Sequence, residues 1–380
     1  MISVVKTDLT RIINPFGLRQ RDFYLIVSIV LFFTGCDQDL KKTKAEDFKI
    51  EISGEAQGTA YSIAYYDLQE RDLKPNVDEI LDRIDQSVST YRQGSVIDKW
   101  NHSQSGFMID ALFLELLLES WKVYSVTNGA FDPTVKPLVS YWGFGPEKFD
   151  SQLDKEDSEI FRLRSLVGLD TLKIILGRDT IKINEIAKID VERDSVYLYK
   201  PVAEMELDFN AIGQGWSVDK VAEYFRSLDV QVFFIEIGGE IVAGNAKPNG
   251  ELWRFGIDKP ESDLNKRQMQ AIARLRSRAI ATSGSYRKYY IKDGSKYSHT
   301  IDPQSGKPVN HGLLSATVFS STATEADAMA TAFMVIGKDS TLSFLSENNY
   351  LGNHVYLIYD SAGITKTFVS PQLRAIIEEQ

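Results

Sequence analysis

A carboxylate and a hydroxyl share one face of an alanine-rich segment near the C-terminal end of this 380-residue chain. The segment TATEADAMATAF (residues 322–333) is typical of a helix, and Asp327 and Thr331 lie four positions apart in it. Residues at that spacing lie on the same side of a helix. Carboxylate and hydroxyl oxygens suit a hard cation such as Mg²⁺. The pair is therefore a candidate cation site.

A second interpretation of Asp327 needs no ligand. Thr324, followed three residues later by this acid, matches a T-x-x-D capping box at a helix start. An acid in the first turn also interacts favourably with the helix dipole. This interpretation explains Asp327 but not Thr331, and the sequence leaves both open.

A glycine-rich segment, LDFNAIGQGWSVDKV (residues 207–221), places Asp208 and the Gly213-Gln214-Gly215 turn before an expected helix. The N–H groups at a helix start suit a phosphate. Val218 occupies the third glycine position, so the G-x-G-x-x-G fingerprint of dinucleotide-binding folds is absent. A plain strand-to-helix turn explains the same glycines.

Two further segments could carry chemistry. GAFDPTVKPLVSYWGFG (residues 129–145) has glycine-flanked aromatics that can line a pocket for a flat ring, although they can equally belong to the core and Asp132 can start a turn. The segment over residues 281–308 holds His299 close to Asp302. That histidine is a candidate general base or a structural hydrogen-bonding group.

The hydrophobic pattern predicts the scaffold for these segments. Alternating apolar and polar residues predict β-hairpins over residues 48–66 and 355–369. Strands are expected at 171–175, 180–183, 188–191, 196–199 and 232–237, and through most of 253–319. Helices are expected over 76–91, with Asn76 as its cap, and over 110–129, 150–164, 217–228 and 324–336. This mixed order predicts an α+β fold: a single large domain with a largely antiparallel sheet and flanking helices.

The N-terminal residues have a different composition. An apolar run of 11 residues, FYLIVSIVLFF (residues 23–33), precedes FTGC, which ends at Cys36, the single cysteine. The run is short for a membrane span of about 20 residues and suits the core of a signal peptide. With FTGC it resembles the lipobox of bacterial lipoproteins. We expect a signal peptide over 1–35, a polar tether over 36–48 that starts at a lipidated Cys36, and a domain over 49–380; a plain membrane anchor is the alternative.

The charge balance narrows the expected partners. The net charge is −10, and cleavage before Cys36 would lower it to −12, because four basic and two acidic residues are removed. Nucleic acid is not an expected partner, since phosphate binding needs clustered Lys and Arg. With one cysteine the chain forms no internal disulfide.

The order of these motifs resembles the FAD:protein FMN transferase family, the ApbE-like flavin transferases. The resemblance implies that FAD bound with Mg²⁺ is cleaved at its pyrophosphate, that FMN is transferred to a Thr or Ser hydroxyl of a target redox protein, and that AMP leaves. It spans about residues 54–337. The matching motifs are GTAY, STYRQGSVIDKWN, GAFDPTVKPL…WGFG, LDFNAIGQGWSVD, EIGGEIVAGN, ATSGSYRKYY…YSHTIDPQSGKPV and ADAMATAFMVIG.

The resemblance also implies residue roles. Asp327, Thr331 and the backbone carbonyl of Ala211 would bind Mg²⁺, and His299 would be the base for the acceptor hydroxyl. Family members are often exported lipoproteins, so the expected location is the bacterial cell envelope, on the extracytoplasmic side, with the lipid on Cys36 attaching the chain to the membrane. Contacts to FAD would come from Gln57, Tyr91, Ala130, Phe131, Asp132, Asp208, Gln214 and the backbone near Ile301.

Three positions depart from the family pattern. Gln214 stands where Lys is usual, Ser285 where an acidic residue follows TSG, and Glu236 where Asn is common before the paired glycines. Because Gln214 brings no charge, weaker binding of phosphate or adenine is expected. Two alternatives use the same residues: an FAD pyrophosphatase that gives FMN and AMP, and a flavin-binding lipoprotein without turnover.

Overall fold

An antiparallel sheet of eight strands organises the structure, which is a computed structural model. The structure describes residues 48–145, 156–176, 179–183, 185, 196–260, 268–285, 289–292, 295–347 and 352–380. Every neighbouring pair of strands in this sheet is antiparallel. In spatial order the strands are β1 (Lys49–Ala56), β2 (Thr59–Tyr66), β7 (Phe233–Ile237), β8 (Glu240–Ala243), β11 (Arg278–Gly284), β14 (Leu313–Ser320), β15 (His354–Ser361) and β16 (Ile364–Val369).

The two faces of this sheet pack against different layers, because successive side chains of a strand point to opposite faces. On one face, Val242 of β8 and Ala279 of β11 pack with Phe225 of α7 (Gly213–Ser227). On the other face, Ile241 and Ile280 pack against a smaller sheet. That sheet has the order β17-β10-β9, with β9 (Trp253–Asp258), β10 (Met269–Leu275) and β17 (Ile377–Glu379).

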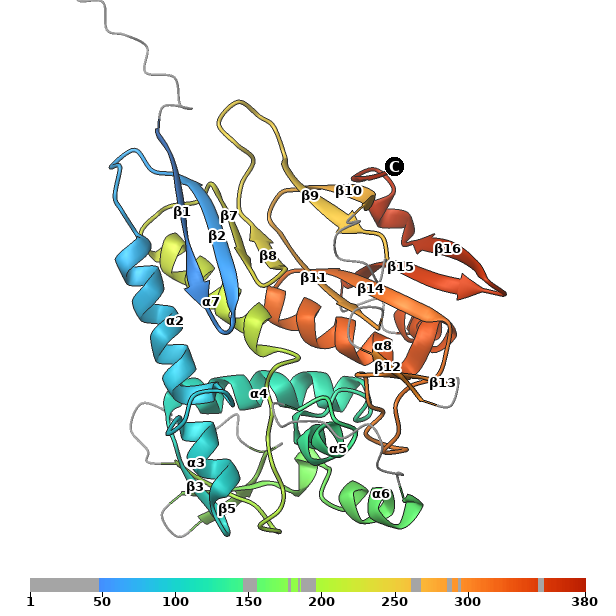
Figure 1. Cartoon of the computed structure of the whole chain (residues 1–380). Coiled ribbons are helices and arrows are strands. Elements are labelled where there is room, and N and C mark those ends of the chain that lie inside the picture. Colours follow the sequence, from blue (N-terminus) through green and yellow to red (C-terminus); the bar gives the residue numbers. More distant parts are fainter. Residues whose placement is uncertain are drawn as a thin grey trace, which may run out of the picture. The chain divides into compact units, whose positions relative to one another are not determined.

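The helices α7 and α8 (Ala323–Glu347) lie side by side on the first face, as Figure 1 shows. Their backbones come so close at Gly215 that a Cβ on this residue would lie 2.3 Å from the carbonyl oxygen of Ala323. The alanines of α8 are therefore explained by helix packing. The helix bends at Gly337, whose φ of 79° is not helical.

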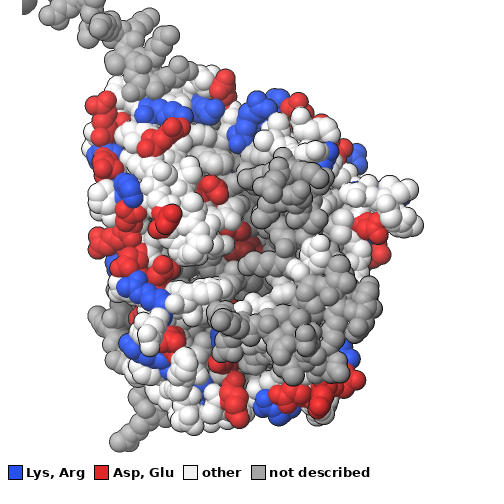
Figure 2. Space-filling model, viewed as in Figure 1, with Lys and Arg blue, Asp and Glu red and all other residues white. Residues whose placement is uncertain are grey.

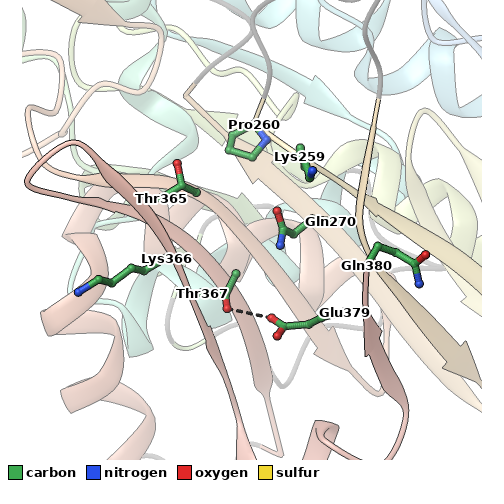
Figure 3. A pocket seen from close by; sticks show the side chains of 8 residues that line it. All are labelled: Lys259, Pro260, Gln270, Thr365, Lys366, Thr367, Glu379 and Gln380. Atoms are coloured by element: carbon green, nitrogen blue, oxygen red, sulfur yellow. Dashed lines mark hydrogen bonds between the residues drawn. The ribbon is translucent and has the colours of Figure 1, made fainter.

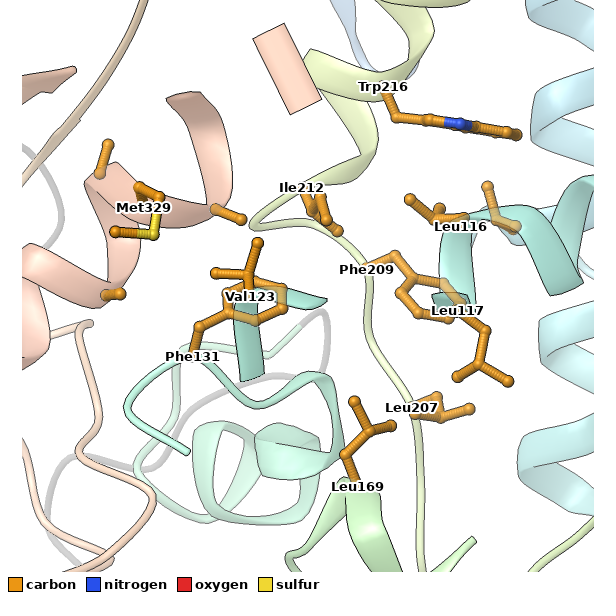
Figure 4. Close-up of a cluster of buried hydrophobic side chains, with 14 of the residues drawn as sticks. Leu116, Leu117, Val123, Phe131, Leu169, Leu207, Phe209, Ile212, Trp216 and Met329 are labelled. Atoms are coloured by element: carbon orange, nitrogen blue, oxygen red, sulfur yellow. The ribbon is translucent and has the colours of Figure 1, made fainter. Parts of the chain in front are cut away.

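A second group of elements holds the segments that precede α7. Its core joins α4 (Ala111–Val126) to residues Phe209 and Ile212 and to Phe131 (Figure 4). This packing fixes the loop of residues 129–145 and the loop before α7, which both carry predicted FAD contacts. The other elements of the group are α2 (Lys74–Val88), α3 (Val96–His102), α5 (Lys136–Tyr141), α6 (Asp157–Arg164), β3 (Gly106–Ile109), β4 (Lys173–Leu176), β5 (Asp179–Lys182) and β6 (Val196–Tyr199), with the hairpin β12 (Tyr289–Lys292) and β13 (Ser295–Ser298) nearby.

The predicted α+β class and both hairpins are confirmed. The helix expected over 110–129 is α4, where the side chain of Asp110 accepts a hydrogen bond from the N–H of Phe113. Asn76 as a helix cap is wrong, because α2 already begins at Lys74 with a proline in its first turn. The helix expected over 324–336 is the first part of α8, because Gly337, with φ of 79° and ψ of 173°, is not helical and separates it from a second helical segment that runs to Glu347.

Some expectations lie outside the described residues. They are the signal peptide over 1–35, the lipidation of Cys36, nearly all of the tether over 36–48, the strand over 188–191 and the start of the helix over 150–164, whose described part is α6. Within the described part, no helix has both the length and the apolar character that a membrane span needs.

Acidic and basic side chains are interspersed on the face of the molecule in Figure 2. Elsewhere in the described chain, surface pairs include Lys74 with Asp78 at 2.7 Å and Lys122 with Glu119 at 2.6 Å. Exposed pairs of this kind contribute little to stability, so the fold depends mainly on its buried layers.

Candidate active site

Asp327 lies buried where α8 meets the start of α7. Its Oδ2 accepts a hydrogen bond from the backbone N–H of Gly215 at 3.0 Å. Gly215 belongs to the first turn of α7, where backbone N–H groups have no partner within their own helix. Burial raises the pKa of Asp327 to about 7, although the Gly215 N–H acts to lower it.

The capping-box interpretation of Asp327 is wrong. The N–H groups at the start of α8 are bound by Asp219 of α7 instead. Oδ1 of Asp219 accepts from the N–H of Ala323 at 3.0 Å, and its Oδ2 accepts from the N–H and the hydroxyl of Thr324 at 2.8 and 2.5 Å. Because Thr324 finds its partner on the other helix, Asp327 turns to Gly215.

The backbone just before α7 offers the carbonyl oxygen of Ala211, which lies four residues before Gly215. The N–H groups of Ile212 and Gly213 both turn back to the carbonyl of Phe209, at 3.0 and 2.7 Å, and the N–H of Gly215 is already bound. Within the described part of the chain, no group donates a hydrogen bond to the carbonyl of Ala211. This oxygen can therefore accept a ligand bond.

Thr331 lies one turn beyond Asp327 on α8 and is half-buried. Its Oγ1 is 3.1 Å from Oγ of Ser283 on β11, and either hydroxyl can be the donor. The structure thus brings the predicted pair together with a second hydroxyl from the ATSGS motif.

Glu240 adds a second buried acid. It is the first residue of β8 and follows the turn at Gly238 and Gly239. Its Oε2 has no hydrogen-bond partner among the described residues. Burial and the charge of Asp327 raise the pKa of Glu240 well above its usual value. The described residues contain no group of three or more His, Cys, Asp or Glu side chains placed to hold a metal ion, so the oxygen donors here are two acids, hydroxyls and a carbonyl.

Two glutamines predicted to contact FAD flank the start of α7. Gln57, in the turn between β1 and β2, donates from Nε2 to Oγ of Ser217 at 2.5 Å, and its buried Oε1 has no partner in the described residues. Gln214 packs over Gly238, where a Cβ would lie 2.7 Å from Nε2 of Gln214. The structure therefore places both glutamines near the start of α7, the helix end that Asp327 contacts.

Asp208 and Tyr91 are joined by a residue that the sequence analysis did not select. The N–H of Asn210 donates to Oδ1 of Asp208 at 2.8 Å, and its Nδ2 lies 3.1 Å from Oδ2 of Asp208 and 3.4 Å from the hydroxyl of Tyr91. Burial of the carboxyl raises the pKa of Asp208, against the effect of these hydrogen bonds. Tyr91 is 68% exposed, so its ring is available to a ligand.

The Ala130-Phe131-Asp132 segment is buried, and its acid serves its own loop. Oδ1 of Asp132 accepts hydrogen bonds from the N–H and the hydroxyl of Thr134, at 2.8 and 2.6 Å. Burial raises the pKa of Asp132 to about 6, while the bonds from Thr134 lower it. Pro133 accepts a backbone hydrogen bond from Asp208 at 2.8 Å, which joins this segment to the loop before α7.

His299 follows β13, and its ring packs against Phe144 with centroids 6.2 Å apart and planes at 67°. Ile301, two residues on, is buried and forms a β-bridge with Pro308. Nε1 of Trp142 donates to the carbonyl of Gly306 at 2.8 Å. The segment that holds the candidate base therefore lies against the aromatic loop of residues 129–145.

A cavity of about 700 Å³ lies away from these residues (Figure 3). In it, Glu379 accepts hydrogen bonds from Thr367 and Tyr356 at 2.8 and 2.9 Å. None of the predicted site residues lines it, so this cavity is not part of the candidate site. That site is built around the starts of α7 and α8. The cavity is lined by Lys259, Pro260, Gln270, Thr365, Lys366, Thr367, Glu379 and Gln380.

Comparison with known proteins decides the family. A family profile described as the ApbE family matches residues 57–353. The chain belongs to the ApbE family. It is 31% identical to the FAD:protein FMN transferase of Escherichia coli K12, over 93% of this chain and 96% of the relative. It is 32% identical to that of Vibrio cholerae O395, over 86% and 91%.

Solved structures of the ApbE family have the same fold. The flavin transferase ApbE from Vibrio cholerae matches with a TM-score of 0.72 and 30% identity, over 86% of this chain and 99% of that one. The flavinyl transferase ApbE from Pseudomonas stutzeri matches with a TM-score of 0.71 and 30% identity, over 86% and 96%. The family match spans all the predicted site residues from Gln57 to Thr331.

Sequence reasoning missed several residues that shape this ApbE-family site. Glu240 and Ser283 stand inside motifs that carried the resemblance. Neither residue gave a separate signal, because the sequence does not show that an acid after two glycines, or a serine in a strand, faces the site. Asp219 and Gly215 of α7 form hydrogen bonds with residues of α8 that lie more than a hundred positions away in the sequence. Only the packing of α7 on α8 could reveal them.

Proposed function

We propose that this ApbE-family protein transfers FMN from FAD to an acceptor protein in a Mg²⁺-dependent reaction, outside a bacterial membrane to which a lipid on Cys36 anchors it. The activity of an FAD:protein FMN transferase follows from family membership, because relatives of that name align over most of the chain. The metal is supported by two observations: Asp327 and Thr331 share one side of α8, where Asp327 binds the Gly215 N–H, and the carbonyl of Ala211, four residues before Gly215, accepts no hydrogen bond from the described residues.

The donor set at this place fits Mg²⁺. Its atoms are a carboxylate oxygen of Asp327, the hydroxyl of Thr331 and the carbonyl oxygen of Ala211, and hard cations prefer such ligands. The orphaned Oε2 of Glu240 also fits a cation in this position. When bound, Mg²⁺ would supply positive charge to the pyrophosphate oxygens of FAD.

The chain's own residues would hold FAD and move one proton. In the reaction, the acceptor oxygen bonds to the FMN phosphorus, the bond from that phosphorus to the AMP oxygen breaks, and AMP leaves. His299 would take the proton of the acceptor hydroxyl, because an imidazole is suited to this task near neutral pH. Gln57, Gln214 and Asp208 would orient the FAD from the start of α7.

The test is incubation of the purified chain with FAD, Mg²⁺ and a Thr-containing acceptor protein, with AMP and protein-bound flavin measured together. Equal amounts of AMP and covalently bound flavin are expected. Free FMN released in place of bound flavin would instead indicate the pyrophosphatase. Tight FAD binding without AMP would indicate a flavin-binding protein without turnover.

The anchor has its own test. The full chain expressed in a bacterium should fractionate with membranes and carry a lipid that can be labelled metabolically. Cys36→Ala should lose the label. If the label stays, Cys36 is not the lipidated residue. That result would not count against the proposed FMN transfer.

A further inference from the structure

Glu240 is a buried acid that does not belong to the ligand set of Asp327, Thr331 and the Ala211 carbonyl. It is 7% exposed, and its Oε2 has no hydrogen-bond partner among the described residues. A buried carboxylate without a partner costs several kcal/mol unless a proton or a cation compensates it. Glu240 is therefore compensated by a proton or by a cation, and no side chain in the described part of the chain bonds its Oε2.

The position of Glu240 in the sheet directs its side chain to the helices. β8 pairs with β11 so that Val242 lies opposite Ala279 and Ile241 opposite Ile280. Glu240 is two residues before Val242, so both side chains point to the face that α7 covers. Asp327 of α8 is on this same side, and its charge acts on Glu240.

In the described part of the chain, the surroundings of Asp327 and Glu240 provide a backbone hydrogen-bond donor but no Lys or Arg paired with either acid. Asp327 accepts one hydrogen bond, from the Gly215 N–H, and the groups that shift the pKa of Glu240 include two acids and no Lys or Arg. The turn before Glu240 is made of two glycines with φ of 68° and 116°; Gln214 fills the space over Gly238, whereas a Cβ at Gly239 would meet nothing within 4 Å. Asp327 and Glu240, which have no basic partner among the described residues, therefore suit a cation.

We propose that Glu240 supplies a second carboxylate to the cation site, so that Asp327 and Glu240 hold one divalent cation between them. This inference rests on the proposed function, because it extends the Mg²⁺ site of that reaction. The cation class is one that prefers oxygen ligands, such as Mg²⁺ or Mn²⁺.

The test compares two matched variants of the full chain without FAD. Glu240→Gln keeps the size of the side chain and removes its charge. Glu236→Gln removes a charge from the same hairpin; Glu236 lies opposite Ile241, on the far face of the sheet. Binding of Mn²⁺ is measured by electron paramagnetic resonance, and binding of Mg²⁺ by calorimetry.

Glu240→Gln should weaken binding of both cations at least tenfold, and Glu236→Gln should change it less than twofold. Without metal, Glu240→Gln should melt at the same temperature as the wild type or above it, because a buried charge has been removed. Equal affinity in wild type and Glu240→Gln would overturn the proposal. A metal-free melting temperature well below wild type would also overturn it, since that result assigns Glu240 a structural role.

The same measurements separate this inference from the proposed function. If the wild type transfers FMN and Glu240→Gln binds the cation normally, the inference alone fails. If the wild type binds the cation through Glu240 but forms no protein-bound flavin, the proposed function fails and the cation site stands.

Discussion

Asp219 and Asp327 cap each other's helices. Asp219 of α7 binds the N–H groups of Ala323 and Thr324 at the start of α8, and Asp327 of α8 binds the N–H of Gly215 at the start of α7. Each acid thus meets the positive end of the other helix dipole. This exchange fixes Asp327 beside the loop that carries the Ala211 carbonyl, so the proposed ligands are positioned by two rigid helices.

Gly215→Ala should destabilise the fold and displace Asp327. The new Cβ would lie 2.3 Å from the carbonyl oxygen of Ala323, so the helices must separate. We expect a loss of roughly 1–3 kcal/mol in the free energy of unfolding, measured by urea denaturation, together with loss of FMN transfer. Gly213→Ala is the matched control, because its Cβ would have 4.0 Å to the nearest atom. Equal stabilities of the two variants would contradict the close helix contact.

Asp327→Asn should keep the fold and lose the reaction. The amide oxygen can still accept the Gly215 N–H, but the charge that would bind the cation is gone. We expect FMN transfer to fall by about a hundredfold or more, measured as protein-bound flavin. Asp339→Asn removes an exposed acid from the same helix and should leave the rate unchanged. Full activity of Asp327→Asn would remove Asp327 from the metal site.

The starts of α7 and α8 also show how much of the fold and the site the sequence predicts. The spacing of Asp327 and Thr331 predicted a shared face, and the motif order predicted the family and the antiparallel α+β fold. The partner of Asp327 was not predictable, because a T-x-x-D pattern describes only a helix's own N–H groups. Glu240 and Ser283 enter the site from strands, where one residue in two points to the helices, and their roles depend on a register that the sequence does not give.

Asp132 should make stability depend on pH. Its ordinary pKa is 3.8 and burial raises its pKa in the fold to about 6. Between these values the folded state binds more protons than the unfolded state, so this residue's contribution to stability is present below about pH 4 and is lost as pH rises through 6. Asp132→Asn keeps the acceptor for Thr134 and does not titrate. The wild type should lose roughly 2–3 kcal/mol relative to this variant from pH 4 to pH 7, measured by urea denaturation at each pH. Parallel curves for the two proteins would show that Asp132 is not the titrating group.

His299→Asn should remove one limb of the pH–rate profile. If His299 takes the acceptor proton, the wild-type kcat/KM should rise with pH as the imidazole loses its own proton. The variant should be about a hundredfold slower or more, with a flat profile in this range and little change in the KM for FAD. A slower variant that keeps the wild-type limb would assign His299 a positioning role.

Gln214→Lys should strengthen FAD binding. Gln214 lies in the first turn of α7 and packs over Gly238, at the end of the site where the proposed cation ligands meet. A Lys there adds a positive charge near the proposed pyrophosphate position, and a partly exposed charge of this kind contributes modestly. We expect the Kd for FAD, measured by flavin fluorescence, to fall about threefold at low salt, with less gain at high salt because ions screen the charge. Gln214→Met has similar length without charge and should bind no tighter than wild type. If Met and Lys strengthened binding equally, packing on Gly238 and not charge would set the affinity at this position.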